Sequence, residues 1–237
     1  FDDVLLGNAG ANLLDGGKGV DLMAGGVGND TYVIDSALDQ MVEAAAGGTD
    51  TVRTLLSHTL AAEFENLMLL GSGNLAATGN AANNVLTGNT GSNRLNGGSG
   101  TDTASYAGAR AGVVVGLDLV GPQSTGAGID TLLSIESLRG SSHDDTLHGN
   151  AGSNVLDGGS GTDTLSYARA AAAVTVDLSL TTAQATGGAG TDTLAGFENL
   201  TGSAFADTLR GSSADNRLDG GAGADTMIGG AGNDSYI

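Results

Sequence analysis

The stretch GGAGADTMI-GGAGNDSYI at Gly220–Ile237 is two consecutive nine-residue units with the same glycines and the same aspartate. Close copies begin at Gly16, Gly25 and Gly158. Throughout the chain, position 6 of the unit holds Asp or Asn and position 8 is almost always apolar. A short fixed period of this kind predicts a repeat architecture in which each unit supplies one tight glycine loop and one short strand.

The apolar residue at position 8 is expected to face the interior. Positions 7 and 9 are mixed, and successive side chains of a strand point to opposite faces, so one side chain per strand is buried. The predicted core residues of this kind are Leu14, Met23, Tyr32, Leu86, Leu95, Leu147, Leu156, Leu165, Leu209, Leu218, Met227 and Tyr236.

The glycine loops present carbonyl oxygens and one carboxylate, which are ligands for Ca²⁺. This ion takes six to eight oxygens at about 2.3–2.6 Å and tolerates irregular geometry. One loop cannot supply that shell, whereas two loops stacked one coil apart can. If two units make one coil, position-6 residues 18 apart are neighbours, which predicts three Asp–Asp and three Asn–Asp pairs: Asp3/Asp21, Asp145/Asp163, Asp207/Asp225, Asn12/Asp30, Asn84/Asp102 and Asn216/Asp234.

The Asp–Asp pairs are the stronger candidates, because two full charges attract the ion more than one. Loops that begin at Gly16, Gly25, Gly158, Gly220 and Gly229 are expected to contribute to the same sites. At the ends of repeat runs we expect ligands from neighbouring segments, such as Asp50, Asp130 or Asp192. The alternative is a plain Asx turn without metal, since Asp and Asn favour tight turns.

The unit resembles the G-G-x-G-x-D-x-U-x repeat of RTX (repeats-in-toxin) calcium-binding proteins. Gly220–Ile228 and Gly229–Ile237 match it almost perfectly. The resemblance implies a parallel β-roll, calcium bound between successive coils and type I secretion. We therefore expect an all-β, right-handed parallel β-roll or β-solenoid that holds several Ca²⁺ ions, at an extracellular or bacterial cell-surface location.

Repeat runs at 1–33, 79–105, 140–166 and 202–237 alternate with spacers at 34–78, 106–139 and 167–201. The spacers resemble each other, because the sequence at 97–107 returns at 158–168 with an offset of 61. We interpret them as longer β coils of one elongated solenoid over 1–237, itself a fragment of a longer chain. Strands are expected at 51–60, 65–70, 113–119 and 174–180, and short helical turns at 35–46 and 168–173.

The composition excludes several classes of partner and site. The formal net charge is −19, from 27 acidic and 8 basic residues, which argues against a nucleic-acid partner. There is no cysteine, which excludes disulfides and thiolate zinc sites, and no apolar run reaches transmembrane length. Carboxylates packed at solenoid spacing repel one another, so the metal-free chain is expected to be loose and to fold when calcium binds.

No catalytic constellation is present, so no enzymatic activity is expected. The GGSG segments lack the second glycine of a nucleophile elbow, and His143 and His148 have no accompanying HExxH pattern. Glu43, Glu65, Glu136 and Glu198 lie in spacers; Glu136 and Glu198, at equivalent positions of the long repeat, are expected to be solvated or turn-capping, with hydrogen bonds between coils as the alternative. Two other functions stay open: a self-associating surface-layer or filament subunit, and an accessory module of an exported enzyme.

Overall fold

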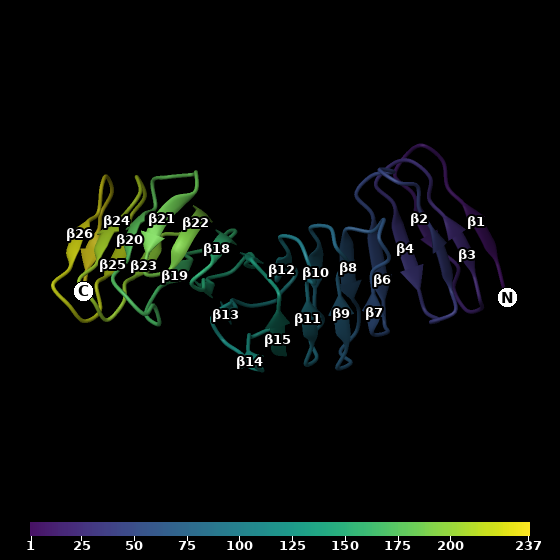
Figure 1. Cartoon of the computed structure of the whole chain (residues 1–237), viewed down its shortest axis with the longest axis horizontal. Helices are drawn as coiled ribbons and strands as arrows, with labels where there is room; N and C mark the ends of the chain where they lie inside the picture. Colours follow the sequence, from purple (N-terminus) through teal and green to yellow (C-terminus); the bar gives the residue numbers. More distant parts are fainter. The chain divides into compact units, whose positions relative to one another are not determined.

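The computed structural model describes residues 1–237 and contains strands and turns but no helix (Figure 1). The chain divides into two compact units. The first comprises Phe1–Ala104 with Gly128–Ile135, and the second comprises Ser105–Ala127 with Glu136–Ile237. The continuity of the whole chain as one solenoid stays a prediction.

Strands of the first unit are two to five residues long and follow one another in three sheets. The first sheet has the order β1 (Val4–Leu6), β3 (Leu22–Ala24), β5 (Gln40–Val42). The second has β2 (Leu13–Asp15), β4 (Thr31–Ile34), β6 (Thr51–Thr54), β8 (Asn66–Leu69), β10 (Val85–Thr87), β12 (Thr103–Ser105). The third has β15 (Ile129–Leu133), β11 (Arg94–Asn96), β9 (Ala76–Thr78), β7 (His58–Thr59).

The second unit repeats this plan. One sheet has the order β13 (Val114–Gly116), β17 (Thr146–His148), β19 (Thr164–Ser166), β23 (Asn199–Thr201), β25 (Arg217–Asp219), β27 (Ser235–Tyr236). Another has β16 (Ser137–Arg139), β18 (Ser153–Asp157), β22 (Gly190–Ala195), β21 (Gln184–Gly187), and a third has β20 (Thr175–Asp177), β24 (Thr208–Arg210), β26 (Thr226–Ile228). The short strand β14 (Gln123–Ser124) also belongs to this unit.

Register within the repeat runs confirms that two nonapeptides make one coil. Leu5 pairs with Met23, and Leu209 pairs with Met227, both in parallel strands 18 residues apart in sequence. The strand that intervenes in sequence lies in a different sheet, as the alternation of odd and even labels in Figure 1 shows. The predicted all-β parallel roll is therefore the observed fold.

Spacers enter the same sheets with coils of other lengths. In the first unit, β6 pairs in parallel with β4 and β8, and β8 pairs with β10. In the second unit, β21 and β22 form an antiparallel hairpin before β22 pairs in parallel with β18. The predicted spacer strands are present as β6, β7, β8, β13 and β20.

The predicted short helices at 35–46 and 168–173 are wrong. Residues 40–42 instead form the repeat-like strand β5, in which Met41 pairs with Met23 of β3. The Asp39 carboxylate accepts the amides of Asp35 and Ser36, which closes a turn before the strand. Residues 168–173 begin with a turn in which the Ala170 amide donates to the Tyr167 carbonyl.

The core is a single file of apolar side chains along each sheet. Met23, Tyr32, Leu86, Leu95, Leu147, Leu156, Leu165, Leu209 and Leu218 are fully buried, and Leu14 is 3% exposed. Met227 is half-buried and Tyr236 is 53% exposed, because both lie on outermost strands, β26 and β27. Phe64 from a spacer packs edge-on against Tyr32, with ring centroids 5.3 Å apart.

No segment is a helix with the length and hydropathy needed to cross a membrane.

Candidate metal centres

A ladder of hydrogen bonds connects the position-6 residues of successive coils. The backbone N–H of each residue donates to Oδ1 of the position-6 residue one coil later. All six predicted pairs are joined in this way, at the distances Asp3–Asp21 2.8 Å, Asn12–Asp30 2.7 Å, Asn84–Asp102 2.7 Å, Asp145–Asp163 2.8 Å, Asp207–Asp225 2.9 Å and Asn216–Asp234 3.0 Å. The structure thus stacks these loops, and in each pair Oδ1 of the later aspartate accepts a hydrogen bond from the earlier loop.

The second carboxylate oxygen has no protein partner in several of these loops. Oδ2 of Asp21, Asp30 and Asp163 is buried and accepts no hydrogen bond, although the three residues are at most 1% exposed. An unpaired buried carboxylate is strongly unfavourable, so such groups pair with cations or coordinate metals. These oxygens fit a cation in the loop.

Glycine at position 1 makes room for that oxygen. A Cβ on Gly158 would lie 2.8 Å from Asp163 Oδ2, and a Cβ on Gly220 would lie 2.5 Å from Asp225 Oδ2. The position-6 carboxylate lies equally close over Gly16, Gly25 and Gly229. Any side chain at these positions would fill the space beside the carboxylate.

Backbone carbonyls of the adjoining coil also approach the other glycines of the loop closely. In one stack, the Asn80 and Ala82 carbonyl oxygens would lie 2.7 and 2.6 Å from a Cβ on Gly98 and Gly100. Both glycines have positive φ, +99° and +129°, a region that only glycine adopts readily. At Gly202 a Cβ would meet both Asp207 Oδ2 and the Gly220 carbonyl oxygen of the next coil, so carboxylate and carbonyl oxygens from two coils converge there, and these are the donors that Ca²⁺ prefers.

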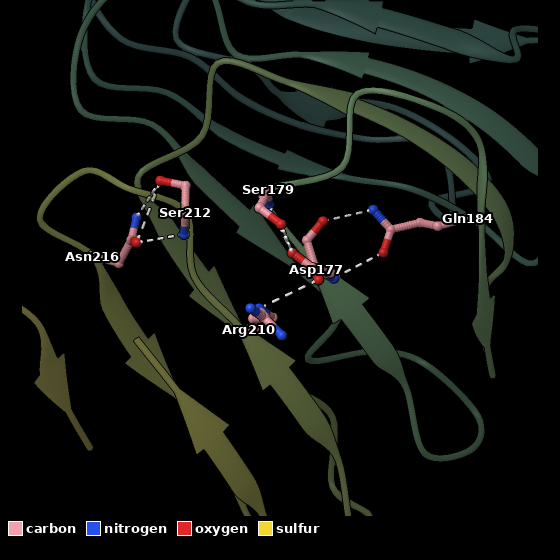
Figure 2. A network of polar contacts seen from close by, with 6 residues as sticks. All are labelled: Asp177, Ser179, Gln184, Arg210, Ser212 and Asn216. Atoms are coloured by element: carbon pink, nitrogen blue, oxygen red, sulfur yellow. Dashed lines mark hydrogen bonds and ion pairs between the residues drawn. The ribbon is translucent and has the colours of Figure 1, made fainter. Parts of the chain in front are cut away.

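Loops with Asn at position 6 are arranged differently. Their position-2 residue is Asn or Ser, and its backbone amide donates to the position-6 Oδ1, as in Asn80 to Asn84 at 2.7 Å and Ser212 to Asn216 at 2.7 Å. Figure 2 shows Asn216 turned towards Ser212. The Asn216 amide nitrogen also donates to the Glu198 carbonyl at 2.9 Å. Protein hydrogen bonds thus satisfy these side chains, and the sequence signal for them is the residue at position 2.

Asp145 and Asp207 combine features of both kinds of loop. Each follows a serine at position 2, and Ser141 and Ser203 donate both their amide and their hydroxyl to the carboxylate. The predicted ligand Asp192 is also fully engaged: Asn154 N donates to its Oδ1, while Tyr167 Oη and Thr186 Oγ1 donate to its Oδ2. Asp3, Asp225 and Asp234 are more exposed than these residues.

The causes of the raised pKa values differ among three of these carboxylates. Burial, together with the charges of Asp145, Glu198 and Asp144, raises the pKa of Asp163 from 3.8 to about 6, against the opposing effect of the Asp145 N–H. Burial raises the pKa of Asp50 as well, and the charged groups that act on it, Glu43, Glu65 and Asp30, are all carboxylates. Burial also raises the pKa of Asp192, although the three donors oppose it. A cation would relieve the first two cases.

Spacer residues continue the ladder; the sequence indicated Asp50 and, as an alternative, an inter-coil hydrogen bond of Glu198, but not Asp39 or Glu65. Asp39 accepts the amide of Asp21, and Asp50 accepts that of Asp30. Glu65 accepts the amide of Asp50 at 2.8 Å, and Glu198 accepts that of Asp163 at 2.9 Å. Both glutamates lie in the sequence Phe-Glu-Asn-Leu, so this short motif was the available signal.

Longer spacers also contain a polar clamp outside the ladder. Gln184 accepts the Asp177 amide and donates to its carbonyl, and Arg210 lies 3.5 Å from the Asp177 carboxylate (Figure 2). Gln123 makes the same two bonds to Gly116, 61 residues earlier. The clamp confirms the long repeat seen in the sequence and forms no metal site.

Four stretches of the chain match one protein family, the RTX calcium-binding nonapeptide repeat: residues 1–32, 77–105, 135–168 and 201–236. They cover more than half of the chain, so this protein belongs to that family of calcium-binding repeat proteins.

Among curated proteins, the endo-1,3-1,4-beta-glycanase ExsH of Rhizobium meliloti is 46% identical to this chain over 59 residues. That stretch is 25% of this chain and 12% of the relative. The chain therefore spans a small part of the relative's length.

Proposed function

We propose that this chain is a calcium-dependent structural module of an exported bacterial protein, and that it folds when Ca²⁺ binds between its stacked glycine loops. The observation that carries the proposal is the set of buried carboxylate oxygens without protein partners in Asp21, Asp30 and Asp163. With a formal net charge of −19, the folded state gathers anions that only bound cations can offset. Binding to the folded state alone then stabilises it.

The working location that we propose is outside the cell or on its surface, after type I secretion. Extracellular calcium sites bind with dissociation constants of about 0.1–1 mM, so such sites are filled outside the cell and empty in the cytosol. Far-UV circular dichroism of the whole chain in EGTA and in about 5–10 mM Ca²⁺, which is about 5–10 times the weaker constant, tests the coupling. We expect β signal only with calcium; equal β content after chelation would refute it.

A second candidate role is an accessory module of an exported enzyme that acts on glycans. The match to a glycanase supports this role, and the absence of a catalytic constellation in the sequence argues that the chain itself is not the enzyme. Incubation of the calcium-loaded chain with a mixed-linked 1,3-1,4-β-glucan should release no new reducing ends. Hydrolysis by the chain alone would overturn the non-enzymatic assignment. Self-association of the calcium-loaded chain stays a prediction.

A further inference from the structure

Three carboxylates meet where the first repeat run passes into its spacer. Oxygens of Asp30, Glu43 and Asp50 all lie within 4.8 Å of one another. Asp30 is the position-6 residue of the last nonapeptide in the run, whereas Glu43 and Asp50 belong to the spacer. Two oxygens bound to the same Ca²⁺ can be at most about 5 Å apart, twice the bond length, so one ion can contact all three side chains.

Two of the three carboxylates are buried and each has one oxygen without a partner. Asp30 and Asp50 are both 1% exposed. Their Oδ1 atoms accept the amides of Asn12 and Asp30, while both Oδ2 atoms accept nothing. No lysine or arginine is among the groups that perturb Asp50. The two free oxygens therefore call for a cation from solution.

The third carboxylate is held in place by a buried phenol. Tyr32 occupies position 8, where most units have leucine, and its hydroxyl donates to Glu43 Oε2 at 2.5 Å. The Gly25 amide donates to the same phenol oxygen at 2.6 Å. The other Glu43 oxygen, Oε1, and the Gly26 carbonyl would lie 2.7 and 2.8 Å from a Cβ on Gly47, so these two oxygens face a common point.

We propose that Asp30, Glu43 and Asp50 bind one Ca²⁺ ion in a site built half from the repeat and half from the spacer, with the Gly26 carbonyl as a further oxygen ligand. The inference rests on the proposed calcium function and adds ligands that the nonapeptide pattern does not contain.

Equilibrium dialysis with Ca²⁺ tests the site. It measures the calcium-binding isotherms of the wild-type chain and of the whole-chain variant Glu43→Gln. We expect one class of site to weaken at least tenfold while the others keep their affinity. The matched control is Glu63→Gln, which removes the same charge from an exposed turn of the same unit. Identical isotherms for wild type and Glu43→Gln would overturn this inference alone, whereas a wild-type chain that binds no calcium would overturn the proposed function itself.

The variant Tyr32→Phe separates ligation from packing. It removes the hydrogen bond to Glu43 but keeps all three carboxylates, so the number of bound ions should stay that of wild type. With Tb³⁺ in place of Ca²⁺, luminescence excited through tyrosine should fall in Tyr32→Phe, because its nearest antenna is lost. If Glu43→Gln and Tyr32→Phe both fail to fold, the hydrogen bond between Tyr32 and Glu43 is a structural contact. Glu43 then has no separate role as a calcium ligand, and the site is refuted.

Discussion

Replacing Asp163 by asparagine should change stability in opposite directions with and without calcium. Asn keeps an Oδ1 that can accept the Asp145 amide, now at 2.8 Å, but removes the charge of the oxygen that has no partner. Asp192 provides the contrast, since both of its oxygens accept hydrogen bonds from the protein.

The size of the effect without calcium follows from the raised pKa. A tenfold change in proton affinity corresponds to about 1.4 kcal/mol, so a pKa of about 6 against 3.8 sets an upper limit of about 3 kcal/mol on the cost of the Asp163 charge. The loop can relax around the charge and the effective dielectric inside a protein is well above that of a dry interior, so we expect Asp163→Asn to gain on the order of 1 kcal/mol in EGTA. Asp192→Asn should lose about 1–3 kcal/mol, because a buried donor loses its acceptor.

With calcium the sign for Asp163 reverses. Each tenfold loss of calcium affinity removes about 1.4 kcal/mol of stabilisation when the ion is well above its dissociation constant. We therefore expect Asp163→Asn to be destabilised by at least about that amount at saturating Ca²⁺. Asp192→Asn should lose the same stability as in EGTA, because its partners are protein groups.

Urea unfolding followed by circular dichroism measures both conditions, with an osmolyte added to the EGTA samples to keep the metal-free chain folded. Asp35→Asn, an exposed aspartate, is the control for the change of charge. Destabilisation of Asp163→Asn by the same amount with and without calcium would show that this carboxylate is a structural acceptor, and the reasoning would fail.

Two other predictions concern the loops. By urea unfolding in calcium, Gly17→Ala should lower the free energy of unfolding by about 1–2 kcal/mol, because φ is +68° although the space around a Cβ is open. Gly98→Ala should lower it more, because φ is positive there too and the Cβ would lie 2.7 Å from the Asn80 carbonyl oxygen. Gly108→Ala, with open space and no positive φ, is the control and should be nearly neutral. Equal losses at Gly17 and Gly98 would exclude the close approach of the two coils. Without calcium, the folded state binds protons more tightly than the unfolded chain at Asp163, so its contribution to stability is present below pH about 4 and lost as pH rises through about 6. Melting temperatures in EGTA, with the same osmolyte present to keep the metal-free chain folded, should thus be higher at pH 5 than at pH 7.5, and a metal-free chain more stable at pH 7.5 would contradict the raised pKa.

The sequence predicted the parts of the fold that depend on a fixed period. A spacing of nine residues placed Asp21 over Asp3 and Asp163 over Asp145, and it placed one apolar side chain per strand in the core, because each coil in the runs has the same length. These features need only neighbouring coils of 18 residues. The resemblance to RTX repeats added calcium to the same positions.

The sequence indicated Asp50 as a spacer ligand, but it could not pair most spacer residues with their partners, because the coils there vary in length. The ladder step from Asp30 to Asp50 spans 20 residues, the next step to Glu65 spans 15, and the step from Asp163 to Glu198 spans 35. No period finds these partners, and the apolar pattern of 35–46 suggested a helix where β5 forms. The residue at position 2 distinguishes the two kinds of loop: with glycine there, Oδ2 of Asp163 has no protein partner, whereas Ser141 donates hydrogen bonds to the Asp145 carboxylate.

The most direct test of the central claim is anomalous diffraction from crystals of the whole chain grown in saturating Ca²⁺. We expect calcium peaks between stacked loops, within about 2.3–2.6 Å of the second carboxylate oxygens of Asp21, Asp30 and Asp163. A map in which the loops stack as described but contain no calcium peak beside these aspartates would contradict the account.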